Sequence, residues 1–165
     1  MAKPLVLIGP MGAGKSTLGR KLAKLLETKF LDTDRMISAS HGPIPKIFEE
    51  HGEDRFRTLE TVALEKALRS PAVIATGGGV VVTKKNRELL QDMPTIFLDT
   101  NAEWVLSRIN LDKRPLLKSD PSMWEKLYKE RLGYYQQLAT ATVVTANRPI
   151  RVVLEELESK ARDVL

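Results

Sequence analysis

The fold is decided by the stretch Gly9-Pro10-Met11-Gly12-Ala13-Gly14-Lys15-Ser16-Thr17, called the P-loop below. It matches G-x-x-x-x-G-K-[ST] at every fixed position, the sequence form of a phosphate-binding loop. An apolar run at 5–8 precedes it and an amphipathic run at 18–26 follows, so it joins a predicted strand to a predicted helix. The glycines allow a tight turn, and the backbone N–H groups that begin the helix face one point, where an anion binds.

Two side chains add to this phosphate site. Lys15 supplies a mobile positive charge for the β- and γ-phosphates of a nucleotide, and the Ser16 hydroxyl is placed to coordinate Mg²⁺. We therefore predict ATP and Mg²⁺ as cofactors. The predicted nucleotide-binding residues of the loop are Gly12, Ala13, Gly14, Lys15, Ser16 and Thr17.

Length and composition bound the alternatives. The 165 residues, 42% of them hydrophobic, suffice for one domain with a real core, which we place at 1–165. The absence of cysteine excludes disulfides and thiolate metal sites. The net charge of +5 could indicate nucleic acid, but the basic residues are scattered and aromatics are only 5%, which favours an enzyme with anionic substrates. We expect a cytoplasmic monomer that binds neither nucleic acid nor membrane.

Strand-like runs alternate with helical patterns along the chain, which predicts an α/β protein with a five-stranded parallel sheet covered on both faces. The predicted strands are 4–9, 30–34, 73–75, 95–98 and 142–144. The predicted helices include 16–27, 84–91, 102–109, 122–138 and a closing helix from 150. Two segments fall outside this pattern. A helical insert, with its substrate-binding region at 33–61, is broken near Gly42 and Gly52, and a polar stretch at 110–121 is long enough for a lid.

Two aspartates, Asp32 and Asp34, stand one residue apart at the end of the second predicted strand. In an extended segment both carboxylates would face the phosphates, where one could hold Mg²⁺ and the other could accept a bond from the hydroxyl to be phosphorylated. Alternatively, they cap the following helix. Asp99 ends another strand and presents the same choice between metal ligand and cap.

Further candidates lie far from the P-loop in sequence. The triple-glycine segment, Gly77-Gly78-Gly79, follows a strand and is either a flexible turn or a place where a ligand approaches bare backbone. Arg57 and Arg131 lie on predicted helices, where exposed ion pairs or a solvated face are the simpler interpretations. Arg114 lies in the lid candidate and could swing onto ATP. We interpret Trp104 as a packing residue.

Together these segments resemble the shikimate kinase family over the whole length of the chain. The matching segments are GPMGAGKST at 9–17, LDTD at 31–34, IFEEHGEDRFRTLE at 47–60, TGGG at 76–79, KRPLL at 113–117 and the Arg131 region ahead of Tyr135. The resemblance implies transfer of the γ-phosphoryl group of ATP to the 3-hydroxyl of shikimate, on the route to chorismate and the aromatic amino acids. It also implies a three-layer P-loop kinase fold, similar to nucleoside monophosphate kinases, with a helical substrate-binding insert and a lid loop.

The resemblance further implies the roles of the substrate residues. Asp34 matches the aspartate that binds the shikimate hydroxyls and would act in catalysis. Arg57, Gly78 and Arg131 match groups that hold the substrate, with the two arginines on its carboxylate. A fork of donors on each guanidinium suits a planar carboxylate.

On the nucleotide side, the resemblance assigns Arg114 to the ATP phosphates, where with Lys15 it would serve catalysis. It assigns Ser16 and Asp32 to the magnesium site, and it places Arg148 near the adenine. Two alternatives remain open from the residues alone. One is another small-molecule P-loop kinase, for gluconate or a nucleoside monophosphate, and the other is a nucleotide-binding switch that transfers no phosphate.

Overall fold

The computed structural model describes residues 1–113 and 115–165. Five parallel strands form one sheet in the order β2-β3-β1-β4-β5, which confirms the predicted fold class. The strands are β1 (Leu5–Ile8), β2 (Lys29–Asp32), β3 (Ala72–Ala75), β4 (Thr95–Asp99) and β5 (Ala141–Val144). In the central register Leu7 lies opposite Ala75 of β3 on one side and Ile96 of β4 on the other.

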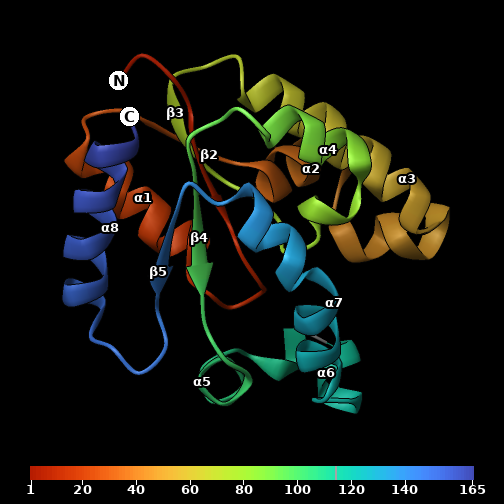
Figure 1. The fold of residues 1–165 in the computed structure, drawn as a ribbon. Coiled ribbons are helices and arrows are strands. Elements are labelled where there is room, and N and C mark those ends of the chain that lie inside the picture. The colour runs from red at the N-terminus through yellow and green to blue at the C-terminus, as the bar shows by residue number, and fades with distance from the viewer. Residues whose placement is uncertain (114) are drawn as a thin grey trace.

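Helices cover both faces of the sheet (Figure 1). The helices are α1 (Lys15–Leu25), α2 (Thr33–His41), α3 (Ile44–Ala67), α4 (Lys84–Leu90), α5 (Ala102–Leu106), α6 (Pro115–Ser119), α7 (Met123–Leu138) and α8 (Ile150–Val164), with short 3₁₀ turns η1 (Val80–Val82) and η2 (Leu111–Lys113). Helices α1 and α8 pack on one face, and α3, α4 and α7 on the other. No helix in the described ranges is long and apolar enough to cross a membrane.

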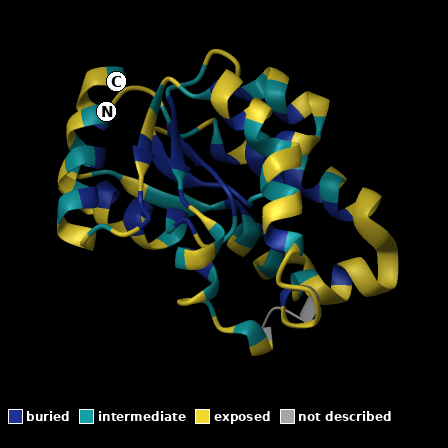
Figure 2. Ribbon diagram, turned by 60° about the horizontal axis from the view of Figure 1, so that its bottom comes forward, coloured by how far each residue is buried: buried dark blue, intermediate teal, exposed yellow. Residues whose placement is uncertain are grey.

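The central strand explains the two-faced core. All four residues of β1 are fully buried, as expected for a parallel strand covered on both sides. Because successive side chains alternate between faces, Leu5 and Leu7 pack in the cluster formed with α1 and α8, whereas Val6 and Ile8 pack in the cluster formed with α3 and α7. Figure 2 shows the sheet as buried and the outer helix surfaces as largely exposed.

The connections create a crevice at the carboxyl edge of the sheet. Strands β1 and β3 are neighbours, but β1 leads into α1 on one face and β3 leads toward η1 and α4 on the other (Figure 1). The loops after these two strands therefore diverge, which is the arrangement that opens a binding crevice in parallel α/β sheets. The P-loop and the triple-glycine segment are these two loops.

Two expectations about local structure need correction. Strand β2 ends at Asp32, and Asp34 lies in the first turn of α2, so the two carboxylates do not share a strand. Asp32 becomes the N-cap instead, because a helix begins immediately after it. The stretch 110–121 was expected to be irregular but contains η2 and α6. Within it, Arg114 lies outside the described residues.

The breaks in the helical insert agree with the glycine positions. Helix α2 ends at His41, and the next residue, Gly42, has φ 85°. Helix α3 is interrupted at Gly52, with φ 81° and ψ 175°, backbone angles that a side chain makes costly. The insert is thus three helical pieces, and Arg57 lies on the piece after the break.

Candidate active site

The crevice is a cavity of about 520 Å³ between the P-loop and the triple-glycine segment, a volume that suits a small ligand. It brings together residues from the P-loop, α2, α3, the triple-glycine segment and α7. Of the predicted site residues, those that line it are Gly12, Gly14, Lys15, Ser16, Thr17, Asp34, Arg57, Gly78 and Arg131. The pairing of Arg57 with Arg131 matters most here, because 74 residues of sequence separate two side chains that line one cavity.

The P-loop backbone has the strained turns that its glycines allow. Gly14 is the residue before α1 and has φ 93°, so the N–H groups of the first helical turn are open toward the crevice. Gly9 has φ 145°, and a Cβ there would overlap the carbonyl oxygen of Leu98. The Lys15 side chain folds over this turn, where its Nζ donates to the carbonyl oxygens of Gly9 and Pro10, the latter at 2.9 Å.

Asp32 caps a helix and also faces the P-loop, so its two predicted roles, helix cap and magnesium ligand, are compatible. Its Oδ1 caps α2 by accepting from the Arg35 N–H at 3.2 Å. Its Oδ2 accepts from the Ser16 hydroxyl at 2.6 Å. Hydroxyl and carboxylate oxygens suit Mg²⁺, which usually takes one or two protein ligands and completes its shell with phosphates and water.

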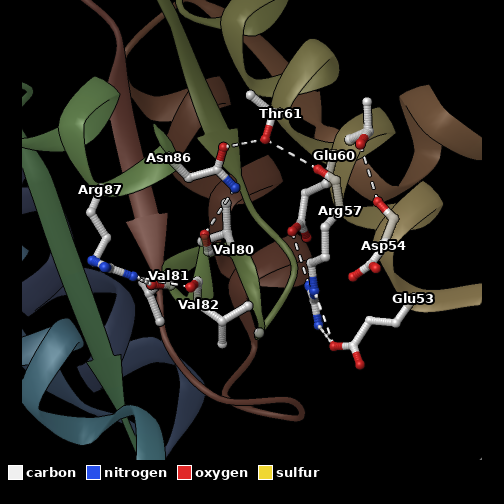
Figure 3. A network of polar contacts seen from close by, with 12 residues as sticks. Glu53, Asp54, Arg57, Glu60, Thr61, Val80, Val81, Val82, Asn86 and Arg87 are labelled. Atoms are coloured by element: carbon white, nitrogen blue, oxygen red, sulfur yellow. Dashed lines mark hydrogen bonds and ion pairs between the residues drawn. The ribbon is translucent and has the colours of Figure 1, made fainter. Parts of the chain in front are cut away.

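Arg57 is held by two carboxylates from its own helix (Figure 3). Its Nη1 donates to Glu60 Oε1 at 2.9 Å, and its Nη2 lies 3.3 Å from Glu53 Oε1. The Arg57 side chain is only 16% exposed and that of Glu60 1%. Arg57 is therefore not the exposed ion pair of the simpler interpretation. Its guanidinium lies beside Gly79 and lines the crevice.

Burial of Glu60 raises the pKa of its carboxyl above the ordinary value, because desolvation disfavours the charged form. The positive charges of Arg57 and Arg131 act in the opposite direction on the same carboxyl. Both guanidinium groups thus interact electrostatically with the Glu60 carboxyl. Glu60 Oε2 has no hydrogen-bond partner among the described residues.

The triple-glycine segment lies against the functional side chains. A Cβ on Gly77 would come 2.9 Å from Asp34 Oδ1, and a Cβ on Gly79 would come 2.5 Å from Arg57 Nη2. Either contact would displace the side chain concerned. Close packing of the Asp34 and Arg57 side chains therefore explains Gly77 and Gly79 better than a flexible turn. The approach of a ligand to this backbone stays a prediction.

Two residues that support this segment were missed as site residues. Asn86 is fully buried, donates to the carbonyl oxygen of Val80 at 3.0 Å and accepts from the Thr61 hydroxyl at 2.7 Å (Figure 3). It thereby ties α3 to the end of the glycine turn. Tyr135, which is also fully buried, donates its hydroxyl to the carbonyl oxygen of Gly78. The only available signal was that a buried tyrosine usually needs a polar partner.

A second cavity, of about 450 Å³, shares part of the P-loop with the first. It is lined by the two remaining nucleotide-site candidates that the structure describes on this side, Ala13 and Arg148. Arg148 is fixed by Glu156 at 2.6 Å and by the carbonyl oxygen of Val144 at 2.7 Å. Trp104 lines this cavity, and the Arg108 guanidinium carbon lies 3.0 Å from its ring centroid. Trp104 is half-buried, and together with Arg108 it also forms part of the wall of this cavity.

Asp99 belongs to neither cavity. Its Oδ1 accepts from the Tyr128 hydroxyl at 2.8 Å and from the Thr100 N–H at 2.9 Å. Asn101, rather than Asp99, caps α5 by accepting from the Trp104 N–H. Burial, followed by the bond to Asp99, raises the pKa of Tyr128. Asp99 therefore anchors α7 and is not positioned as a metal ligand.

Comparison with known proteins gives consistent results. The shikimate kinase family model matches residues 11–162. A shikimate kinase of Neisseria gonorrhoeae is 45% identical over 149 residues, which cover 87% of this chain and 88% of the relative. A shikimate kinase of Rhodococcus erythropolis is 39% identical and covers 99% of both chains. The solved structure of shikimate kinase from Acinetobacter baumannii in complex with shikimate has a TM-score of 0.87 and 41% identity, covering 94% of this chain and 90% of that one.

Proposed function

The chain belongs to the shikimate kinase family, and we propose that it phosphorylates shikimate with the residues that line the crevice. The enzyme transfers the γ-phosphoryl group of ATP to the 3-hydroxyl of shikimate, giving shikimate 3-phosphate and ADP, in chorismate and aromatic amino acid biosynthesis. One observation carries the assignment of residues. The P-loop, Asp34 and two arginines from separate helices line a single cavity.

The phosphate end of the crevice, formed by the P-loop, would hold the ATP phosphates. Backbone N–H groups at the start of α1 and the positive end of that helix favour an anion there. Lys15 already lies over the loop, and its ammonium would move from the Gly9 and Pro10 carbonyls to the β- and γ-phosphates. Arg148 lines the adjoining second cavity, which suits the nucleoside. Arg114, from the lid segment, would add a positive charge at the phosphates.

Mg²⁺ would be held by the Ser16 hydroxyl and by the Asp32 carboxylate, directly or through water. When bound, the ion would supply positive charge that compensates the charge developing on the phosphates during transfer. The capping bond from Arg35 to Asp32 Oδ1 fixes the carboxylate and leaves Oδ2 toward Ser16. The chain thus contributes two preplaced oxygen ligands.

The acid end of the crevice, formed by Asp34, Arg57, Gly78 and Arg131, would hold shikimate. Two guanidinium forks can engage the substrate carboxylate in a fixed plane. The ion pair with buried Glu60 keeps Arg57 in place. With the acid anchored at one side, the 3-hydroxyl would face the γ-phosphate beside Asp34.

Transfer then needs alignment and charge compensation more than covalent help. The 3-hydroxyl oxygen forms a bond to the γ-phosphorus while the bond from that phosphorus to the β,γ-bridging oxygen breaks, and ADP leaves. The hydroxyl proton passes to the Asp34 carboxylate. Asp34 lies in the first turn of α2 against Gly77, and this packing limits the directions in which its oxygens can point.

We place the enzyme in the cytoplasm as a monomer that acts on shikimate and ATP without nucleic-acid or membrane partners. The helical region 33–61 would serve as the substrate-binding subdomain and 110–121 as the lid within one domain. A size-exclusion measurement with light scattering checks the oligomeric state, and a dimer mass would contradict it.

An ADP-release assay tests the function directly. The protein is given ATP and Mg²⁺ with shikimate, gluconate or AMP in parallel. We expect rapid ADP release with shikimate alone, and phosphate on the 3-hydroxyl of the product by ³¹P and ¹H NMR. Turnover only with gluconate or AMP would overturn the substrate assignment. Nucleotide binding without transfer to any of the three would favour a switch.

A further inference from the structure

The carbonyl oxygen of Gly78 depends on one distant side chain. On either side, the carbonyl oxygens of Gly77 and Gly79 accept hydrogen bonds from N–H groups three residues further along the same turn, each at 3.1 Å. That of Gly78 accepts from the Tyr135 hydroxyl at 2.5 Å, and no other donor to it occurs within residues 1–113 and 115–165. The Gly78 carbonyl, in the middle of the triple-glycine segment, is thus held by a side chain of α7.

Tyr135 is itself rigidly placed. Its side chain is fully buried on α7, and its ring stacks on Phe97 of β4 with centroids 5.1 Å apart. Burial raises the pKa of the hydroxyl to about 12, although the nearby charge of Arg131 opposes the shift. The hydroxyl therefore keeps its proton at neutral pH and can donate it to the carbonyl.

The same hydroxyl lies between two parts of the acid end. Arg131 precedes Tyr135 by one helical turn on α7, so the two side chains are neighbours on that helix. On the other side, the Gly78–Gly79 peptide is planar, and fixing its carbonyl also fixes the direction of the Gly79 N–H. Gly79 in turn packs against the Arg57 guanidinium.

We propose that Tyr135 is a positioning residue for shikimate, which acts by fixing the Gly78–Gly79 peptide between Arg57 and Arg131. This inference rests on the proposed function and deepens it. It makes Tyr135, which does not line the cavity, responsible for the relative positions of the two arginines. Loss of the hydroxyl frees the peptide to rotate. The two guanidinium groups then meet the substrate carboxylate in a poorer arrangement, while the P-loop is unaffected.

The test is Tyr135→Phe, which keeps the ring that stacks on Phe97 and removes only the hydroxyl. A net contribution of about 0.5–1.5 kcal/mol for such a bond corresponds to a rise of about two- to thirteenfold in KM for shikimate. KM for ATP should stay within about twofold. The shift in melting temperature that a fixed shikimate concentration produces should also shrink, which reads out binding independently of turnover.

Two matched variants on α7 separate positioning from stability. Tyr134→Phe alters a tyrosine that is 37% exposed and lies under the Arg87 guanidinium, and it should change neither KM. Tyr128→Phe removes a hydroxyl bonded to Asp99 Oδ1, away from the crevice. It should lower the urea midpoint of unfolding and leave KM for shikimate within about twofold.

The outcomes distinguish the two levels of the proposal. A wild type that neither binds nor phosphorylates shikimate overturns the proposed function and this inference with it. A wild type that turns over shikimate, together with a Tyr135→Phe variant whose KM for shikimate is unchanged, overturns this inference alone. So does a variant whose KM values for shikimate and ATP rise equally, or one that only reproduces the stability loss of Tyr128→Phe.

Discussion

The two ends of the crevice are built in different ways. The phosphate end consists of consecutive residues, 9–17, and its donors are mainly backbone N–H groups at the start of one helix. The acid end is assembled from α2, α3, the triple-glycine segment and α7, and its donors are long side chains. Its geometry therefore depends on how three separate helices pack.

The two ends therefore differ in which substitutions should impair them. The phosphate end needs a turn that glycine permits and a helix that follows it. The acid end also needs residues that contact no substrate, such as Asn86 between α3 and η1 and the buried Glu60 beside Arg57. Variants at the acid end should change the kinetic constants for shikimate and leave those for ATP unaltered. Variants at the phosphate end should lower phosphoryl transfer whatever the acceptor.

The largest effect is expected where the two ends meet, at Asp34. Asp34→Asn keeps the size of the side chain but can no longer take the hydroxyl proton. We expect kcat to fall by about 10²–10⁴-fold, while KM for ATP changes by less than about twofold, measured by coupled ADP release. Asp54→Asn, at an exposed position on α3, should be silent. An Asp34→Asn enzyme with normal kcat would remove this carboxylate from the reaction.

Lys15→Met breaks the phosphate end. The side chain is only 8% exposed, and methionine preserves much of its volume while removing the charge that would stabilise the transferring phosphoryl group. We expect kcat to decrease by about 10²–10³-fold in the same assay. Lys21→Met, on an exposed position of α1, serves as the matched control. Full activity in Lys15→Met would contradict the assignment of the P-loop.

Arg57→Lys alters the acid end alone. Lysine leaves a cation beside buried Glu60 but lacks the fork that suits a carboxylate. Loss of one charge-assisted hydrogen bond, about 1.5–3 kcal/mol, predicts a decrease of about 10- to 150-fold in kcat/KM for shikimate. KM for ATP should be unchanged, as should all constants of Arg55→Lys, an exposed neighbour. Equal losses for both substrates would indicate that the ends are not built separately.

The smallest effect concerns stability rather than rate. Burial raises the pKa of Glu60 from its ordinary value of 4.5, so the folded protein holds this proton more tightly than the unfolded chain. The resulting stabilisation is present below about pH 4.5 and is lost as pH rises through the folded pKa. Urea unfolding should show that wild type loses free energy of unfolding relative to Glu60→Gln as pH increases through that window. A difference that grows in favour of wild type would show that the ion pair with Arg57 outweighs burial.

The contrast between the ends also explains what sequence could predict. The P-loop, the five strands and the breaks at Gly42 and Gly52 follow from local spacing and backbone preference, and the structure confirms them. The shared cavity of Arg57 and Arg131 does not follow from local patterns. Only the family resemblance brought them together, because their proximity depends on how α3 and α7 pack on the sheet.

The errors have the same origin. The predicted strand at 30–34 includes Asp34, and the common direction of the two carboxylates was inferred from it, but α2 begins directly after Asp32. For Trp104, which the sequence suggests only as a packing residue, nothing local indicates the cavity that it also lines beside Arg108. Tyr135 carried no local mark of function, because its partner, Gly78, is 57 residues away in sequence.

The most direct measurement is a crystal structure of the protein with ADP, Mg²⁺ and shikimate. The account predicts the shikimate carboxylate within about 3.2 Å of guanidinium nitrogens from both Arg57 and Arg131. It also predicts the 3-hydroxyl beside Asp34 and the β-phosphate on the P-loop N–H groups. A carboxylate that contacts neither arginine, or a nucleotide whose phosphates lie away from the P-loop, would contradict it.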